Sequence, residues 1–352
     1  MHSSLEKIIP NHFNDPLINA VLTHYKLGQL VQSPKELNSG LTNRVLHVKT
    51  SCEDKVNEYV IKIVDRTAPR ARTKHDYNNM ERLQKFFVDE HQIPGVLAKA
   101  INYERVFEYD HFFVLVYPYV PSRTLAGPIG PVEAKQAFQA GKLLGQIHNG
   151  QLGQTLNLNN LFKGQIFEYN YSLNFIRLNE LLPKYPQLTD KFAKIAEKTQ
   201  TAYQQSRAHM VYGHGDYQPH NLLLVDTGTE QIDLKIIDWE LAGLINPDME
   251  FFTGLITFSG IATDNGFNEN ALLQFIDGYR STGCKLQDNL ENAFYASIHK
   301  CWINWIVFNM ERKNQVEIDR AFPSLLHILE VAPQLFDYIK SNQLVDQPTA
   351  HM

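Results

Sequence analysis

Residues 212–221 read Tyr-Gly-His-Gly-Asp-Tyr-Gln-Pro-His-Asn, and residues 236–240 read Ile-Ile-Asp-Trp-Glu. Between them lie two short apolar runs joined by the turn Asp-Thr-Gly. Two apolar runs joined by such a turn predict an antiparallel hairpin. The hairpin would return Asp238 to the neighbourhood of Asn221, so that two oxygen-bearing side chains meet on one side.

The polar residues of these segments are those that phosphoryl transfer requires. A carboxylate such as Asp216 can orient or receive the proton of an attacking hydroxyl, while an amide oxygen and a second carboxylate can hold Mg²⁺ against phosphates. Glycines on both sides of His214 permit the tight backbone that presents Asp216. An ordinary polar turn with side-chain capping is the alternative, but it rarely combines all these parts.

Composition sets broad bounds on the chain. Its 352 residues suggest two lobes, and 43% hydrophobic with 20% charged residues is typical of a soluble globular protein. A net charge of −5 does not favour nucleic acid as a partner. Cys52, Cys284 and Cys301 lie far apart, which suits a reducing compartment. The N-terminus lacks the apolar core of a signal peptide. No apolar run approaches the ~18–20 residues that a membrane span needs. We therefore expect a cytoplasmic protein outside the membrane.

Strand and helix patterns divide the chain into two parts. Strands are predicted at residues 45–48, 59–64, 105–109 and 112–117. Helices are predicted at residues 73–87, 132–149, 167–183, 188–206 and 286–312. We therefore expect an α+β protein, with a β-rich lobe over residues 1–118 that has one main helix, and a larger helical lobe over residues 119–352.

The His-Gly-Asp…Asn and Ile-Asp-Trp-Glu segments resemble the catalytic core of the aminoglycoside phosphotransferase and choline kinase superfamily, over about residues 30–310. The resemblance implies a bilobal protein-kinase-like fold, with an N-terminal antiparallel β lobe and a larger, mostly α C-terminal lobe. It implies that Asp216 is the catalytic base and that Asn221 and Asp238 bind Mg²⁺. It further implies that His214 holds the loop and that Glu250, on a following helix, braces it.

Lys62 is the next candidate. On the predicted strand 59–64 it lies on the face opposite Ile61 and Ile63. A lysine within an apolar strand is costly unless its ammonium meets an anion, although an exposed edge strand would also tolerate it. The resemblance implies that Lys62 binds the phosphates of ATP. It also implies an acidic partner on the first helix, for which we take Asp76, with Glu81 as the rival.

Two further segments complete the expected ATP site. The turn at residues 38–43 has a single glycine and resembles the Gly-x-x-Asn turn of choline- and homoserine-kinase-like proteins. This resemblance assigns phosphate contacts to Ser39, Gly40, Thr42 and Asn43. Alignment with the family's hinge assigns the carbonyl of Pro118 to the adenine amino group and the N–H of Val120 to the adenine ring.

The acceptor is less clearly marked. On an extended backbone Glu240 would face the same side as Asp238 and could approach a second metal ion or a cationic substrate, or it is simply solvated. Trp302 and Trp305, one helical turn apart, can form an aromatic wall for a cation or can be core residues. Of the two, Trp302 is the better ligand candidate because it is offset from the predicted buried stripe. That stripe comprises Leu290, Phe294, Ile298, Cys301, Trp305 and Phe308.

The sequence thus favours an ATP- and Mg²⁺-dependent phosphotransferase acting on a hydroxyl of a small molecule. Choline, thiamine, amino-alcohol, sugar and aminoglycoside acceptors remain open, as does the oligomeric state. A protein kinase is disfavoured because no Ala-Pro-Glu element follows Asp238, and Trp239-Glu240 replaces the usual Phe-Gly. A non-catalytic nucleotide-binding protein is disfavoured because the full set of expected functional residues is retained together: Lys62, Asp216, Asn221 and Asp238.

Overall fold

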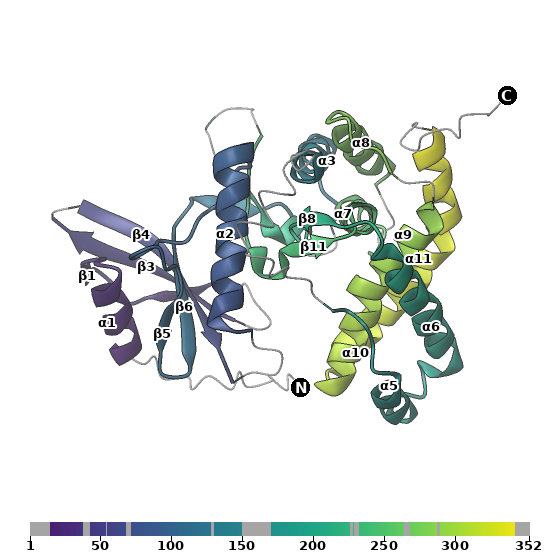
Figure 1. Cartoon of the computed structure of the whole chain (residues 1–352), viewed down its shortest axis with the longest axis horizontal. Helices are drawn as coiled ribbons and strands as arrows, with labels where there is room; N and C mark the ends of the chain where they lie inside the picture. Colours follow the sequence, from purple (N-terminus) through teal and green to yellow (C-terminus); the bar gives the residue numbers. More distant parts are fainter. Residues whose placement is uncertain are drawn as a thin grey trace. The chain divides into compact units, whose positions relative to one another are not determined.

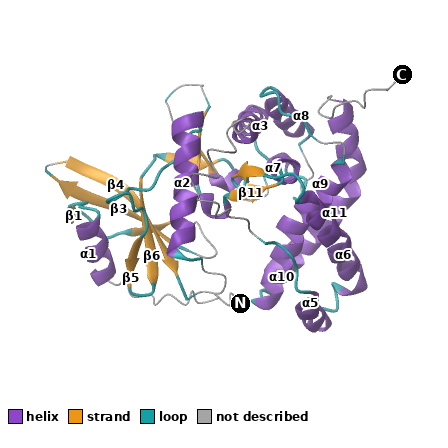
Figure 2. Ribbon diagram, viewed as in Figure 1, coloured by secondary structure: helices purple, strands orange, loops and turns teal. Residues whose placement is uncertain are grey.

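The computed structural model describes residues 15–37, 43–53, 55–67, 72–127, 130–149, 170–225, 228, 232–263, 268–286 and 289–341. The chain forms two compact units, Met1–Glu81 with Val96–Val120, and Arg82–Gly95 with Pro121–Met352. Figure 1 labels their elements, and Figure 2 shows that strands dominate the first unit and helices the second. The α+β class is confirmed. The segment Arg82–Gly95 returns to the second unit, which the sequence did not indicate.

The first unit is built on an antiparallel sheet. Its elements are α1 (Asp15–His24), β1 (Gln29–Leu30), β2 (Lys35–Leu37), β3 (Arg44–Cys52), β4 (Lys55–Asp65), the first part of α2 (Lys74–His91), β5 (Phe107–Tyr109) and β6 (Phe112–Pro118). The strand order is β1-β3-β4-β6-β5, with β2 also paired to β3. The predicted strands and the predicted helix are found. Helix α1 and the short strands β1 and β2 were not predicted.

The two faces of this sheet are covered by different helices. Ile61 and Ile63 of β4 are buried together with apolar residues of α1, which lies against the sheet in Figure 1. Lys62 therefore projects from the opposite face, as the alternation predicted. On that face the hydroxyl of Tyr117 in β6 reaches Glu81 of α2. The ammonium of Lys62 is thus directed toward the α2 side of the sheet.

The second unit is mostly helical. Its longer elements are α3 (Ala134–Asn149), α5 (Phe175–Leu181), α6 (Thr189–Ser206), α7 (Pro247–Ser259), α8 (Glu269–Arg280), α9 (Leu290–Ile298), α10 (Asn304–Glu311) and α11 (Gln315–Ser341). Its strands are β7 (Ser122–Thr124), β8 (Val211–Gly213), β9 (Leu222–Val225), β10 (Asp233–Ile236) and β11 (Gly243–Ile245). Residues 167–169 of the predicted helix 167–183 lie outside the described residues. Within the described ranges, every helix is too short or too polar to cross a membrane.

The predicted hairpin is present. Strands β9 and β10 are antiparallel, with Leu222 opposite Ile236, and β8 pairs with β11. The N–H of Ile237 donates to the carbonyl of Asn221 at 3.0 Å, so the backbone before Asp238 is bonded to the end of the loop. The hairpin therefore brings the two expected metal-binding segments together, as the two apolar runs predicted.

Helix α7 forms the centre of the second unit, since all of its residues are buried. Beside it, α3 and α8 approach so closely that only glycine fits between their backbones. A Cβ on Gly141 of α3 would collide with the carbonyl of Phe275, and one on Gly278 of α8 would collide with the carbonyl of Phe138. This close packing aligns the end of α3 with the end of α8, which matters for the site described below.

A π-helical turn, His299–Ile303, joins α9 to α10. Because its hydrogen bonds span five residues instead of four, each residue after it is displaced around the helix axis. The predicted buried stripe is correct at Phe294 and Ile298 but is displaced beyond the turn, where Trp302 is buried and Trp305 is only partly so. The expectation that Trp302 lies at the edge of the stripe is therefore wrong, because a uniform 3.6-residue period was assumed.

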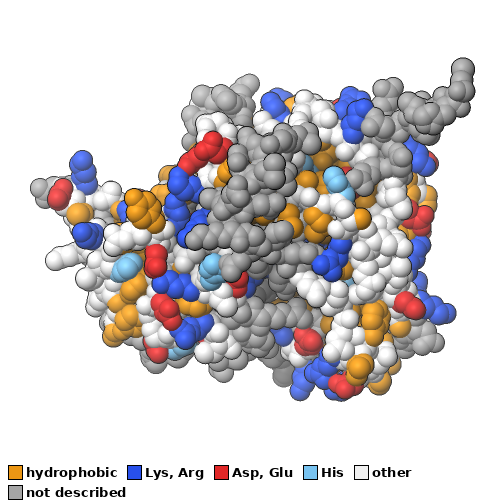
Figure 3. All heavy atoms as spheres, viewed as in Figure 1, with side chains coloured by type: hydrophobic (Ala, Val, Ile, Leu, Met, Phe, Trp, Pro, Cys, Tyr) orange, Lys and Arg blue, Asp and Glu red, His pale blue; other side chains and the backbone are white. Residues whose placement is uncertain are grey.

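The surface carries charges of both signs. On the coloured part of the face shown in Figure 3, Lys and Arg side chains are interspersed with Asp and Glu over both units. This arrangement agrees with the near-balance of 33 basic and 38 acidic residues in the sequence.

Candidate active site

The loop between β8 and β9 presents Asp216. At Gly215 the backbone has φ +80°, and a Cβ there would collide with the carbonyl oxygen of Leu241, so glycine is required. Each carboxylate oxygen of Asp216 accepts one side-chain amide, Oδ1 from Gln218 at 2.8 Å and Oδ2 from Asn221 at 2.9 Å. Asn221 also donates to the backbone carbonyl of Asp216 at 2.8 Å. The carboxylate is therefore held in one orientation. Gln218 was not identified from the sequence.

His214 connects this loop with the hairpin. Its ring is fully buried, Nε2 donates to the carbonyl of Ile237 at 2.9 Å, and Nδ1 accepts from the N–H of Asp216 at 3.2 Å. Burial lowers the pKa of His214, which keeps the imidazole neutral and agrees with one donating and one accepting nitrogen. These contacts are those of a residue that holds the loop.

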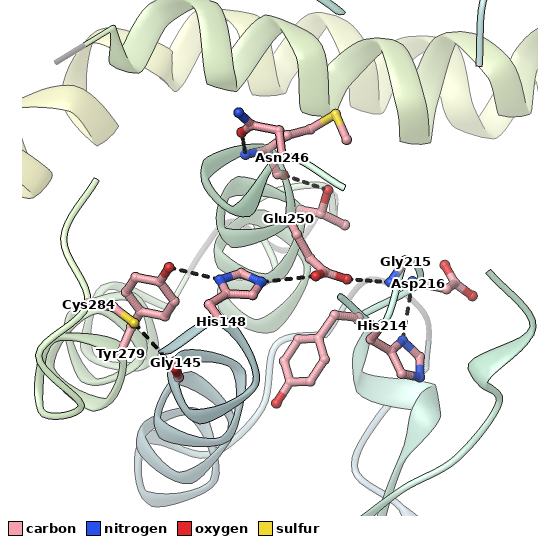
Figure 4. A network of polar contacts seen from close by, with 12 residues as sticks. Gly145, His148, His214, Gly215, Asp216, Asn246, Glu250, Tyr279 and Cys284 are labelled. Carbon is pink, nitrogen blue, oxygen red and sulfur yellow. Dashed lines mark hydrogen bonds and ion pairs between the residues drawn. The ribbon is translucent and has the colours of Figure 1, made fainter. Parts of the chain in front are cut away.

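Glu250 of α7 directs its carboxylate toward the loop at Gly215 (Figure 4). Its carboxylate is fully buried, and it accepts from the N–H of Gly215 at 2.5 Å and from Nε2 of His148 at 3.0 Å. Nδ1 of His148 in turn meets the hydroxyl of Tyr279 at 2.9 Å. Burial by itself raises the pKa of Glu250, but the hydrogen bond and charge of His148 bring it below its ordinary value. A four-residue line of hydrogen bonds thus runs from α8 through α3 and α7 to the loop.

Asp238 has an unusual backbone. Its φ of 62° and ψ of 58° are left-handed, a conformation that costs about 1 kcal/mol for a residue other than glycine and often occurs at functional sites. Its side chain is exposed. The following 3₁₀ turn, Trp239–Leu241, contradicts the extended backbone on which the expectation for Glu240 was based. Glu240 is partly buried on that turn.

The oxygen atoms of Asn221 and Asp238 suit Mg²⁺. Among the described residues, no group of three or more His, Cys, Asp or Glu side chains is arranged to hold a metal ion by itself. Magnesium that is bound with a nucleotide needs only one or two protein carboxylates besides phosphate oxygens and water. Because the amide nitrogen of Asn221 is engaged by Asp216, its Oδ1 is the atom directed to other partners. The two residues therefore fit such an ion.

In the first unit, the acid close to Lys62 is Glu81. Both side chains are buried, and Glu81 accepts from the hydroxyl of Tyr117 at 2.7 Å and the N–H of Ala98 at 3.3 Å. Burial raises the pKa of Glu81, and the positive charge of Lys62 is among the groups that oppose this rise. We therefore take Glu81 as the acidic partner of Lys62, because it is buried and interacts electrostatically with this lysine.

Asp76 has a different place. Its Oδ2 accepts from the N–H and the hydroxyl of Thr73, at 2.9 and 2.8 Å, and its own N–H donates to the hydroxyl oxygen of Thr73 at 3.2 Å. This reciprocal pair caps the start of α2. Because Asp76 is used for capping in the first helical turn, the structure favours its rival Glu81 as the partner of Lys62.

The other expected ATP contacts lie at the ends of strands. Asn43 immediately precedes β3, Pro118 ends β6 opposite Tyr59, and Val120 ends the first unit. Ser39, Gly40 and Thr42 lie outside the described residues.

The two tryptophans of the candidate acceptor site are packed. Trp302 is part of the main apolar core and is 6% exposed. Trp305 stacks on Phe308 with ring centroids 5.6 Å apart, and its Nε1 donates to Glu317 at 3.3 Å. The surroundings of both tryptophans are therefore those of packed residues rather than those of an open aromatic wall that could bind a cation.

A β-rich unit with a buried strand lysine and a helical unit with an Asp-bearing loop are the two halves of kinase-like phosphotransferases. The model of the phosphotransferase enzyme family (APH) matches residues 33–283, well over half of the chain. The chain belongs to this family and is a phosphotransferase. Among curated proteins, no sequence matches the chain.

Solved structures show the same fold at low sequence identity. The spectinomycin phosphotransferase APH(9)-Ia, in complex with ADP and spectinomycin, is 16% identical with a TM-score of 0.57, and 94% of each chain is covered. A microcompartment-associated aminopropanol kinase is 14% identical with a TM-score of 0.60, covering 94% of this chain and 99% of the other. An ethanolamine kinase of Plasmodium vivax is 14% identical with a TM-score of 0.58, covering 94% of each. The expected bilobal kinase-like fold and superfamily are confirmed.

Proposed function

We propose that this protein transfers the γ-phosphoryl group of ATP, with Mg²⁺, to a hydroxyl group of a small molecule. The observation that carries the proposal is the fixed carboxylate of Asp216, each oxygen of which accepts one amide N–H. A carboxylate has about four acceptor positions, so the O–H of an acceptor can be added without displacing either amide. Asp216 would then orient this hydroxyl and receive its proton.

The remaining residues would hold the nucleotide. Asn221 and Asp238 would ligate Mg²⁺ through their side-chain oxygens, and Lys62 would bind phosphate oxygens with its ammonium, oriented by Glu81. When bound, Mg²⁺ supplies positive charge that neutralises the phosphates. Asn43, Ser39, Gly40 and Thr42 stay proposed phosphate contacts, as Pro118 and Val120 stay proposed adenine contacts.

Small molecules are the favoured acceptors because the similar solved structures are named for antibiotics and amino alcohols. Choline, thiamine, amino alcohols, sugars and aminoglycosides are all candidate acceptors. The cytoplasm is the proposed compartment because it supplies ATP and keeps thiols reduced, in agreement with free Cys52, Cys284 and Cys301.

The test is release of ADP from MgATP in the presence of a panel of alcohols, amino alcohols, vitamins, sugars, hydroxy acids and aminoglycosides. With an active acceptor, Asp216→Asn should lower kcat about 10³-fold while MgATP binding is retained. Asp233→Asn, on β10 of the same hairpin, is the matched control and should keep full activity. Binding of MgATP without ADP release for any acceptor would instead indicate a non-catalytic nucleotide-binding protein, and transfer to peptides alone would indicate a protein kinase.

A further inference from the structure

Lys300 is a buried charge in an irregular part of a helix. It is the second residue of the π-helical turn His299–Ile303 and is only 5% exposed. Such turns are rare and frequently lie at functional sites. Removing an ammonium from water is costly unless an anion or several hydrogen-bond acceptors replace the lost hydration. The position of Lys300 therefore requires an explanation.

The neighbours of Lys300 do not provide a counter-ion. Its Nζ lies 3.9 Å from Sγ of Cys301 and 5.4 Å from the ring centroid of Tyr171. Burial raises the pKa of the Cys301 thiol, so this sulfur is neutral at physiological pH. In the parts of the chain that the structure describes, no carboxylate lies within ion-pairing distance of the Lys300 ammonium. The charge is thus surrounded by a thiol and an aromatic ring.

Hydrogen bonds hold this turn in place. Nε2 of His299 donates to the carbonyl of Tyr171 at 3.0 Å, and Nδ2 of Asn304 donates to the same carbonyl at 3.1 Å. On the other side of the imidazole, Nδ1 of His299 lies 3.1 Å from the hydroxyl of Thr199 in α6. The backbone of Tyr171 is therefore fixed to the turn that carries Lys300, and the backbone of Lys300 has a defined position.

The turn contacts α7, the helix whose Glu250 holds the catalytic loop. The sulfur beside Lys300 is 3.5 Å from Oγ1 of Thr253, which lies on α7 one turn after Glu250. Burial by itself lowers the pKa of Lys300, but its neighbours Cys301 and Tyr171, followed by Asp216 and Glu250, raise it above its ordinary value. The lysine is therefore charged and lies within the electrostatic reach of both carboxylates.

Among the described residues, neither carboxylate forms an ion pair with Lys300. Glu250 accepts from the N–H of Gly215 and from His148, and the oxygens of Asp216 accept the two side-chain amides of its own loop. A buried, charged ammonium that has no anion among the described residues, within electrostatic reach of the base, is the arrangement expected where a ligand supplies the anion.

We propose that Lys300 binds the carboxylate of the acceptor, so that the acceptor is a hydroxy acid or hydroxy-amino acid whose hydroxyl lies at Asp216. This inference rests on the proposed function and names its substrate class. A single ammonium provides one charge and matches a carboxylate, whereas a phosphate dianion calls for a second cation. The same ammonium repels cationic acceptors, which sets this protein apart from kinases of amino alcohols.

The test compares acceptors that differ only in the carboxylate: glycerate with glycerol, L-serine with serinol, and gluconate with sorbitol, together with choline and ethanolamine. ADP release from MgATP should show a kcat/KM about 10- to 100-fold higher for the acid of the preferred pair. Lys300→Met should abolish this difference through a higher KM for the acid, with unchanged or improved values for the neutral and cationic compounds. Lys300→Arg should restore part of it.

Lys198→Met is the matched control variant. Lys198 also places its ammonium over a tyrosine ring, 3.7 Å from the centroid of Tyr295, but it is exposed and pairs with Glu291 at 3.2 Å. Its replacement should leave the preference for acids unchanged. An equal loss of activity for all acceptors in Lys300→Met would show a purely structural role, and a wild-type preference for choline or ethanolamine would overturn the proposal outright.

A failure of the proposed function can be recognised separately. If no compound is phosphorylated, calorimetric titration of the same acids into the wild type and Lys300→Met still tests the binding of the carboxylate. Binding of an acid to the wild type that is lost in Lys300→Met supports the inference. Absence of binding for every acid of the panel contradicts it.

Discussion

Glu250 and Lys300 are both buried charges of the second unit, but their surroundings are opposite. Glu250 accepts hydrogen bonds from the N–H of Gly215 and the ring of His148, so its charge is satisfied by the fold. Lys300 has a neutral thiol at 3.9 Å and an aromatic ring as its nearest partners. A charge that the fold satisfies serves to hold other groups in place, whereas a charge that the fold leaves unsatisfied is suited to binding a ligand.

The sharpest test of this comparison is stability. Glu250→Ala should lower the free energy of unfolding by about 3 kcal/mol, because it leaves the N–H of Gly215 and the ring of His148 without their acceptor. Lys300→Met should leave that free energy unchanged or raise it, since the apolar side chain avoids the cost of burying an ammonium. Urea unfolding followed by circular dichroism measures both. An equal loss of unfolding free energy in the two variants would show that the fold satisfies both charges alike.

The second prediction concerns the turn that carries Lys300. Burial lowers the pKa of His299 to about 4, whereas its ordinary value is 6.5. As pH falls from about 6.5 to about 4, the unfolded chain binds a proton that the folded chain does not, so stability is lost on acidification. Over this range the unfolding free energy of the wild type should fall by up to about 3 kcal/mol more than that of His299→Gln. Parallel pH profiles would show that His299 is not neutral in the folded protein.

The third prediction tests the loop that Glu250 holds. Gly215→Ala should destabilise the protein by about 2 kcal/mol and reduce kcat, because a Cβ cannot be placed beside the Leu241 carbonyl at φ +80°. Gly127→Ala is the control, since no atom lies within 4 Å of a Cβ there, and it should have almost no effect. Thermal unfolding and ADP release are the measurements. Full activity in Gly215→Ala would mean that the loop does not need this conformation.

The smallest effects extend the comparison to the first unit. Asp76→Ala should cost at most about 1 kcal/mol, as expected for a helix cap, and should not change the KM for ATP. Glu81→Gln, which can still accept from Tyr117, should raise that KM about tenfold because Lys62 loses its acidic neighbour. Kinetics at varied ATP concentration separate the two. The reverse ranking would restore Asp76 as the partner of Lys62.

Features with a local or regular signal were predictable from the sequence. The hairpin depends on two apolar runs and a turn, and the face of Lys62 depends on alternation along one strand. The loop glycine before Asp216 is also a local requirement. For these features, neighbours in the sequence determine the structure.

Other features depend on distant segments. Glu250 meets His148 across 102 residues, and His148 meets Tyr279 across 131, because α3 and α8 pack through glycines. Which acidic residue of α2 lies near Lys62 depends on which turn of that helix faces the sheet. These contacts carry no periodic signal and follow only from the packing of helices.

The π-helical turn at His299–Ile303 has a consequence for how such an enzyme can diverge. One residue corresponds to about 100° of rotation in an α-helix. Deleting a single residue here would therefore restore a regular helix and reorient the whole face of α10, including Trp305. The number of residues in the turn alone would then determine which side chains of α10 face its neighbours, without any change in the type of those side chains. The packing face of this helix can thus be changed by a deletion of one codon as well as by substitution.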